Sequence, residues 1–144
     1  MKPDEREEFD QNLANLYLYL KRELKLKNEP KVVLDSDQKN ADRMLGKTGY
    51  FNDSEQSIHL FITDRHPKDI LRSFSHEVIH FWQHENDKLS QSNEKTLGPT
   101  YAQDDPVMRK MEKQAYLLGN ILFRDWEDQK KQKDKSVNKK DINI

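Results

Sequence analysis

The segment ILRSFSHEVIHFWQHEND, residues 70–87, constrains the fold more than any other part of the chain. A helix turns by about 100° per residue, which gathers the large apolar side chains of this segment on one arc and places His76 and His80 on the opposite side. The apolar arc consists of Ile70, Leu71, Phe74, Val78, Phe81 and Trp82. The chain must therefore supply a hydrophobic core for one face of this helix and a separate, polar environment for its histidines.

Amphipathic helices are predicted on both sides of this segment. From Pro3 to about Lys27, apolar residues recur every three or four positions and acidic residues crowd the first turn, as at a helix N-terminus. A last helix is predicted to begin at Pro106, with Asp105 as its N-cap, and to run to about Gln129. Residues 131–144 are rich in lysine and nearly free of large apolar side chains, so we expect a disordered tail there.

Short strands are predicted between the first helix and the histidine-bearing helix. KVVL is typical of a strand, and TGYF and SIHLFI (Ser57 to Ile62) are typical of two strands joined by the polar turn NDSEQ. Pro67 begins a helix that runs to about Asn86, and residues 87–104 lack periodicity and form a long loop. The pattern predicts one α+β domain over residues 1–130, with an N-terminal helix, a small, mostly antiparallel sheet, the histidine-bearing helix and a C-terminal helix.

Composition excludes several kinds of chemistry. The chain has no cysteine, which rules out disulfides, thiolate metal ligands and a cysteine nucleophile. With 25 basic and 26 acidic side chains the net charge is -1, so no bulk attraction to nucleic acid or to an anionic membrane is expected. No window has the apolar character of a signal peptide or a membrane span, which favours a cytoplasmic location. Any bound metal must be held by His, Asp or Glu.

HEVIH, from His76 to His80, matches the pattern HExxH. Two histidines four positions apart on a helix reach one zinc ion from the same face, and the glutamate then lies beside the water that the metal activates. The alternative is that both histidines lie at the surface or the edge of the core, with Glu77 serving only as a helix-favouring charge. Zinc in a hydrolytic site usually has three protein ligands and an open position for water, so the first interpretation requires a third ligand.

The last helix supplies a candidate, Glu112, at the edge of its apolar face. That face consists of Met108, Met111, Ala115, Leu118, Leu122 and Trp126. A carboxylate there is costly to bury without a positive partner, and a Zn2+ ion would provide one. Alternatively, Glu112 meets a lysine or water at the edge of the helix. We predict a Zn2+ site formed by His76, His80 and Glu112.

With these residues the chain resembles the zincin superfamily of metallopeptidases, and within it the glutamate-zincins. In that group HExxH is followed, on a later helix, by a glutamate in an E-x-x-A or similar context, and here the matching residues are EKQA, Glu112 to Ala115. The resemblance covers about Thr48 to Trp126. The metzincin extension would need Gly at Gln83 and His at Asn86, and both are absent. SprT-like proteases use a later histidine, but His84 lies on the same helix as the motif.

The resemblance implies a minimal zincin-like domain that hydrolyses peptide bonds, as an endopeptidase rather than an exopeptidase. Glu77 would act as the general base toward a metal-activated water, and the substrate would be a peptide or protein. The strand from Ser57 to Ile62 would be an exposed edge that pairs with extended substrate, although an ordinary core strand is compatible with its sequence.

Two supporting roles remain open in the sequence. The donor that stabilises the tetrahedral oxyanion would be Tyr101 in the long loop, with Tyr116 and His84 as alternatives. Asp125 or Asn120 is a candidate partner for the second ring nitrogen of a ligating histidine.

Two rival functions also remain open. The first is a catalytically inactive zincin-fold module that binds or inhibits another protein. The second is nucleic-acid association through the C-terminal lysines, but Asp128, Asp134 and Asp141 dilute their charge, which favours a merely solvated tail. The sequence predicts no membrane association and leaves the oligomeric state open.

Overall fold

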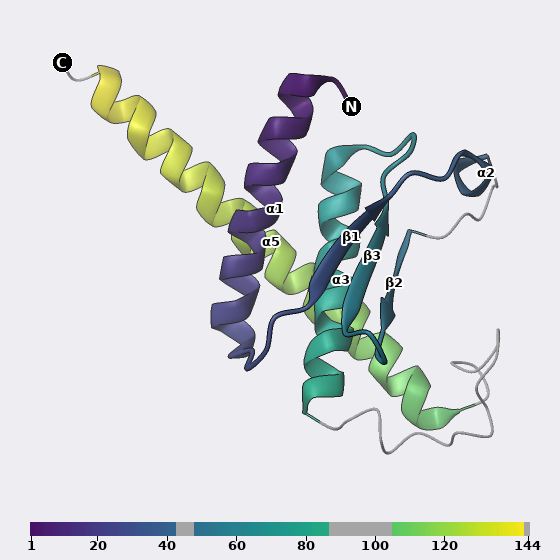
Figure 1. The fold of residues 1–144 in the computed structure, drawn as a ribbon. Helices are drawn as coiled ribbons and strands as arrows, with labels where there is room; N and C mark the ends of the chain where they lie inside the picture. Colours follow the sequence, from purple (N-terminus) through teal and green to yellow (C-terminus); the bar gives the residue numbers. More distant parts are fainter. Residues whose placement is uncertain (43–47, 87–104, 143–144) are drawn as a thin grey trace.

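The computed structural model describes residues 1–42, 48–86 and 105–142, and over these residues the fold is α+β with four helices and a three-stranded sheet (Figure 1). The elements in chain order are α1 (Pro3–Leu24), β1 (Lys31–Asp35), α2 (Gln38–Ala41), β2 (Gly49–Asn52), β3 (Ser57–Phe61), α3 (Pro67–Glu85) and α5 (Pro106–Ile142). The predicted helices and strands are all present, and the short helix α2 is an addition. The predicted loop over residues 87–104 lies outside the described residues.

The sheet has the order β1-β3-β2 and is mixed. In the centre, β3 runs parallel to β1, with Val33 opposite His59, and antiparallel to β2, with Tyr50 opposite His59. The expected mostly antiparallel sheet is therefore corrected to a mixed one. The expectation that β3 is an exposed edge is wrong, because β3 is paired on both sides. Ile58 and Leu60 of β3 are fully buried, and a central position protects such a strand best.

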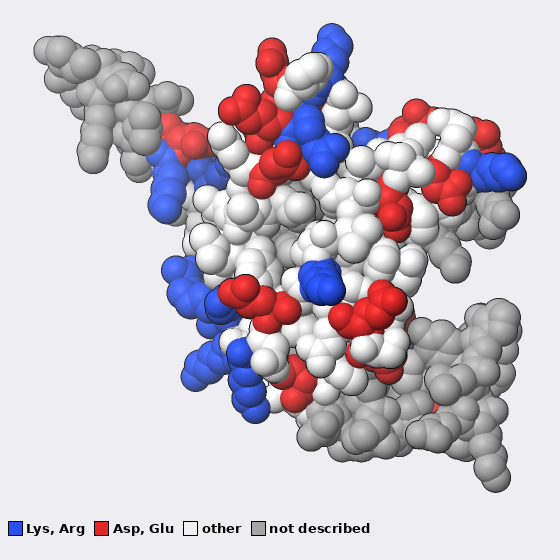
Figure 2. Space-filling model, viewed as in Figure 1, with Lys and Arg blue, Asp and Glu red and all other residues white. Residues whose placement is uncertain are grey.

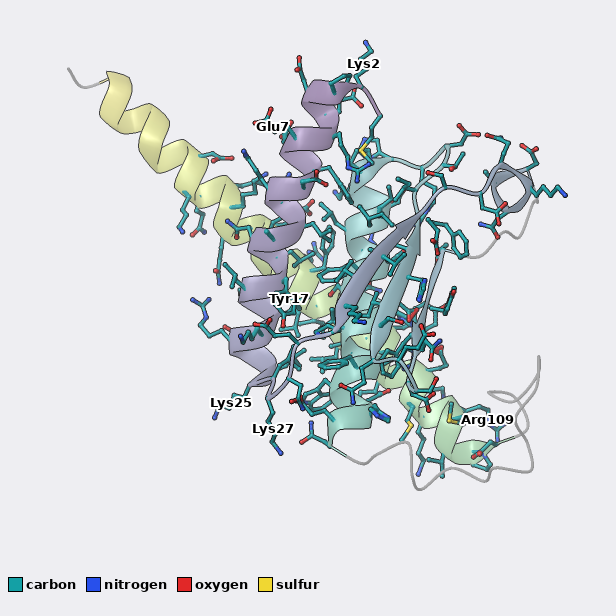
Figure 3. All side chains as sticks on the ribbon, viewed as in Figure 1. Lys2, Glu7, Tyr17, Lys25, Lys27 and Arg109 are labelled. Carbon is teal, nitrogen blue, oxygen red and sulfur yellow. The ribbon has the colours of Figure 1, made fainter. Side chains whose placement is uncertain are left out.

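α3 lies between the sheet and α5, with α1 alongside it (Figure 1). His66 caps its first turn by accepting a hydrogen bond from the backbone of Lys68, and Pro67 follows at the first helical position, where it needs no hydrogen-bond partner. The predicted apolar arc faces the core: Ile70, Leu71, Phe74, Val78 and Phe81 are buried, and Trp82 is partly buried. Tyr17 of α1, labelled in Figure 3, packs its ring 6.4 Å from that of Phe74.

Arg65 ties the sheet to the start of α3. Its Nη1 donates to the carbonyl oxygens of Thr48 and Phe61, both at 2.9 Å, and its Nη2 donates to Ser73 Oγ at 2.8 Å. Burial lowers the pKa of this guanidinium, and the charge of Asp69 partly offsets that effect. Because one side chain contacts the segment before β2, the end of β3 and the first turns of α3, it holds β2 close to the histidine-bearing helix.

Glu85 performs a similar task at the other end of α3. Its carboxylate accepts hydrogen bonds from the backbone nitrogens of Lys27, at 3.0 and 2.9 Å, and of Asn28, at 2.7 Å. Lys27 lies just beyond the end of α1 (Figure 3). The carboxylate thus satisfies backbone donors that follow the helix and fixes α1 against α3.

The beginning of α5 follows the prediction, and its end does not. Asp105 Oδ1 accepts hydrogen bonds from the backbone nitrogens of Val107, at 2.9 Å, and Met108, at 3.4 Å, as an N-cap does. The helix continues to Ile142, so residues 131–142, expected to be a disordered tail, are helical and project away from the other elements (Figure 1). Lys and Gln have favourable helix propensity, which lets an exposed helix continue beyond its packed part.

The distribution of charged side chains and the hydropathy of the helices agree with what the composition predicts. Basic and acidic side chains are interspersed over the face in Figure 2. None of the helices in the described part of the chain combines the length and the apolar character that a membrane crossing requires.

Candidate metal centre

α3 and α5 bring His76, His80 and Glu112 together. The Nε2 atom of His80 lies 2.5 Å from Glu112 Oε1, and that of His76 lies 3.4 Å from the same oxygen. One ligand atom from each residue lies within 4.8 Å of the other two. The spacing of four positions on α3 places the two imidazole rings on the same side of the helix, with centroids 4.9 Å apart. The three residues predicted as ligands thus form one group that could hold a metal ion.

Gly119 allows the two helices to approach beside His76. A Cβ atom at position 119 would lie 3.2 Å from the Cα of His76 and 3.3 Å from its backbone nitrogen, which is tighter than ordinary packing. In addition, Ser75 Oγ donates to the carbonyl oxygen of Gly119 at 2.8 Å. A glycine on α5 and a buried hydrogen bond therefore set the distance between the helices that carry Glu112 and the histidines.

The group is largely shielded from solvent, and its charges are coupled. The side chains of His76, His80 and Glu112 are 17%, 13% and 27% exposed. Burial alone would raise the pKa of Glu112. The hydrogen bonds that Glu112 makes with the two histidines, and the positive charges of those histidines, outweigh burial and lower this pKa. Burial alone would lower the pKa of His80, but the contact with Glu112 and the charge of Glu77 raise it. The short contact between His80 and Glu112 therefore requires a positive charge, from a proton or from a metal ion.

The residues fit a zinc ion chemically. Two imidazole nitrogens and one carboxylate oxygen form a donor set that zinc uses in hydrolytic sites, with one position left for water. Ligand atoms around a tetrahedral zinc lie about 3.3–3.4 Å apart, so the contact between His80 and Glu112 would have to open by about 0.9 Å. The separation of 3.4 Å between His76 and Glu112 already has the required value.

Glu77 lies beside the group and against the sheet. It is only 7% exposed, and its Cγ would be 3.6 Å from a Cβ atom placed on Gly49 of β2. Burial raises the pKa of Glu77, and the charges of His80 and His76 oppose this rise. A sheltered carboxylate with a raised pKa next to a group that could hold a metal ion is a stronger base than an exposed one and is suited to accept a proton.

The structure places the other predicted site residues differently. Tyr101 lies outside the described residues. The Tyr116 ring lies 4.3 Å from the His76 ring, whereas the His84 ring lies 5.6 Å from that of Phe51 in β2. His84 does not belong to the metal-ligating group found among the described residues.

Gln83 is the partner of His80 that the sequence did not indicate. Its Oε1 atom lies 2.9 Å from His80 Nδ1, and the residue is fully buried. Asn120 and Asp125, the candidates for this role, are exposed on α5, and within the described residues neither bonds to a histidine. The signal available in the sequence was spacing, because a residue three positions along a helix lies on the same face.

A second polar cluster, also missed, lies on the sheet. His59 Nδ1 is 3.3 Å from Asp35 Oδ2, and His59 Nε2 is 3.0 Å from Ser57 Oγ. The ring of His59 stacks on that of Tyr50, with centroids 4.5 Å apart. The order of contacts is that of a nucleophilic triad, but Ser57 is only 1% exposed, so a substrate carbonyl cannot reach its hydroxyl. We therefore interpret this cluster as structural.

Comparisons of the chain with protein-family models, with curated proteins and with solved structures find no match.

The pH dependence of stability is predicted to differ between metal-free and zinc-loaded protein. The raised pKa of His80 means that its protonation contributes stability that is fully present below its ordinary value of 6.5 and is lost as the pH rises through the raised pKa. Glu77, raised from 4.5, acts in the same direction. Glu112, lowered from 4.5, contributes stability that is present above that value and is lost as the pH falls.

Zinc requires unprotonated imidazoles, so the stabilisation that it adds should grow with pH. Thermal unfolding midpoints measured with and without zinc from about pH 5 to pH 9 check both trends. A zinc increment that shrinks as the pH rises would contradict coordination through the histidines.

Proposed function

We propose that this chain is a small zinc-dependent peptidase with a minimal zincin-like domain of the glutamate-zincin type. The observation that carries the proposal is the convergence of His76, His80 and Glu112 from two helices, with Glu77 buried beside them. The ligand spacing in the sequence and the geometry of the helix crossing are independent features, and both favour the same three residues. A zinc ion bound there would supply an acidified water and polarise a substrate carbonyl.

Glu77 has the position and the protonation chemistry of the general base. Its raised pKa favours uptake of a proton from the attacking water, and the protonated carboxyl would then pass that proton to the leaving amine. The pKa rise comes mainly from burial, so water exclusion around Glu77 is part of the proposed mechanism. The products would be two peptides from one amide bond.

β2, in place of β3, is the proposed strand for binding extended substrate. It is an edge of the sheet, paired on one side with β3, and no other strand of the described residues pairs with it. Gly49 of β2 lies against Glu77, and Arg65 binds the carbonyl of the preceding Thr48. An extended peptide that adds to this edge would pass beside Glu77, with main-chain hydrogen bonds fixing its register.

Tyr116 is better placed than His84 to stabilise the oxyanion, because its side chain is exposed to solvent and its ring contacts that of His76. Tyr101 stays a prediction for the same role. A phenol at either position would donate a hydrogen bond to the developing negative charge on the substrate oxygen.

The proposal is tested by incubating the zinc-loaded protein with a mixture of peptides and identifying the products by mass spectrometry. Cleavage at internal bonds is expected, together with its loss when 1,10-phenanthroline removes zinc and its return when zinc is restored. The matched control is His84→Ala, which removes a histidine of the same helix outside the group and should leave cleavage intact.

Two results would contradict the peptidase. Cleavage that survives removal of zinc would assign the activity to something other than the centre. Stoichiometric zinc with no cleavage of any peptide would support the inactive binding or inhibitory module.

A further inference from the structure

The buried side chain of Gln83 lies between the two helices that carry the candidate ligands. Its amide nitrogen donates to the carbonyl oxygen of Met111 at 3.0 Å and to Gln114 Oε1 at 2.9 Å, both on α5. Its amide oxygen faces His80 Nδ1 on its own helix. All the polar atoms of this side chain therefore have partners, and the partners belong to both helices.

The backbone carbonyl of Met111 determines which way the amide points. A carbonyl oxygen only accepts hydrogen bonds, so the Gln83 atom next to it must be the nitrogen. The reversed amide would place two oxygens against each other and leave a buried carbonyl without a donor, which is costly. Oε1 of Gln83 is consequently directed at His80, 2.9 Å from Nδ1.

The orientation of the amide fixes the state of one ring nitrogen of His80. Because Oε1 can only accept, Nδ1 must carry a hydrogen. Nε2 is therefore the nitrogen that faces Glu112 Oε1, and at 2.5 Å from a carboxylate oxygen it donates a hydrogen bond when no metal ion is bound. A metal ion would replace that hydrogen on Nε2, while Gln83 would keep the hydrogen on Nδ1.

His76 is held differently. Its Nδ1 atom is buried and has no hydrogen-bond partner within the described residues. The two histidines are thus unequal: His80 is oriented by a buried amide, and His76 is oriented by packing against Tyr116 and the close approach of Gly119.

We propose that Gln83 is a positioning residue that holds the His80 ring by its Nδ1 hydrogen, with Nε2 directed at Glu112, and couples it, through Met111, to the turn of α5 that carries Glu112. The consequence for metal binding depends on the proposed zinc centre, whereas the hydrogen bond from Nδ1 is a property of the chain alone. Partners of metal-ligating histidines typically contribute about 10- to 100-fold to metal affinity. Gln83 makes His80 the preorganised ligand of the pair.

Two substitutions separate orientation from packing. Gln83→Leu removes the acceptor for His80 Nδ1 and should weaken zinc binding by about 10- to 100-fold. Gln83→Glu keeps an acceptor but removes the donor to Met111, so it should lower stability while keeping zinc affinity within a few-fold of wild type. The matched control is Ser75→Ala, which removes another buried hydrogen bond between α3 and α5. That variant should lose stability but not affinity.

The experiment combines zinc affinity, measured by competition with a chromophoric chelator, with long-range 1H–15N spectra of the His80 ring. In metal-free wild type, the spectra should show an Nδ1 hydrogen that exchanges slowly with solvent. Gln83→Leu should lose that protection, and Gln83→Glu should retain it. An Nδ1 hydrogen that stays protected in Gln83→Leu, together with an affinity loss no greater than that of Ser75→Ala, would overturn the inference.

Failure of the proposed function gives a different result. A wild-type chain that binds no zinc contradicts the metal centre, while the exchange rate of the Nδ1 hydrogen in the metal-free protein still decides the role of Gln83.

Discussion

Glu77→Gln is expected to lower the rate of peptide hydrolysis by about 100- to 10,000-fold while the protein keeps its zinc. Glutamine has the same shape but cannot accept a proton, so the water loses its base and the leaving amine loses its proton donor. Burial of Glu77 also favours a neutral side chain, so the variant should be as stable as wild type or more stable at neutral pH. Steady-state kinetics with one cleaved peptide, elemental analysis and thermal unfolding of the same preparation test all three expectations.

Glu85→Gln is the matched control, because it makes the same change on the same helix. Glu85 accepts hydrogen bonds from the backbone of Lys27 and Asn28, away from the metal-ligating group. This variant should lose stability, since a charged acceptor is replaced by a weaker one, and should keep its hydrolysis rate per folded molecule. A Glu77→Gln enzyme as active as wild type would contradict the assignment of Glu77 as the base.

Glu112→Gln is expected to weaken zinc binding more than 100-fold. Loss of a residue that only hydrogen-bonds to a metal ligand typically weakens metal binding by at most about 100-fold, and loss of a ligand itself should exceed that. The substitution removes the negative ligand of the group and leaves an amide, which is a poor ligand for zinc. It also removes the carboxylate that stabilises protonated His80, so the metal-free variant should lose the stability that wild type has at mildly acidic pH. Chelator competition and thermal unfolding measure the two effects.

Glu127→Gln is the control for this variant. Glu127 lies on the same helix and pairs with Lys68 at 3.1 Å, so its loss removes a carboxylate from α5 without touching the centre. Its zinc affinity should equal that of wild type. An unchanged affinity in Glu112→Gln would instead support the alternative in which Glu112 is only a carboxylate at the edge of a helix.

The features that are encoded in short stretches of sequence were predictable. The apolar arc of α3 follows from helical periodicity, and the same projection separates His76 and His80 from the core. Glu112 was predictable because a carboxylate at the edge of an apolar face needs a positive partner. The structure brings these three residues together at the crossing of α3 and α5.

The errors concern contacts between segments that are distant in sequence. The alternation of side chains shows which residues of β3 share a face, but it does not show which strands lie beside β3. The sequence therefore could not show that β3 pairs in parallel with β1 and is not an exposed edge. Of the two outer strands in the described part of the chain, β2 is the one beside Glu77, and the hairpin pattern identified this strand without showing its place. Gln83 was missed because its role depends on the backbone carbonyl of Met111 on another helix.

The end of α5 was misplaced for a different reason. A lysine-rich segment without large apolar residues lacks the signal of a packed helix, but its residues do not oppose helix formation. Trp126 is the last buried side chain described, and its ring nitrogen donates to Asn15 of α1 at 3.1 Å. The described side chains beyond that residue, at positions 127–134, are exposed or partly buried, so helix propensity rather than packing accounts for the continuation there.

The most direct test of the metal centre is anomalous X-ray diffraction at the zinc absorption edge from crystals of the protein loaded with one equivalent of zinc. We expect a single strong peak between α3 and α5, about 2.0–2.2 Å from Nε2 of His76, Nε2 of His80 and a carboxylate oxygen of Glu112, with a fourth position open to water. A peak at another place, or a centre in which Glu112 contacts the histidines directly and no zinc is bound, would contradict this expectation.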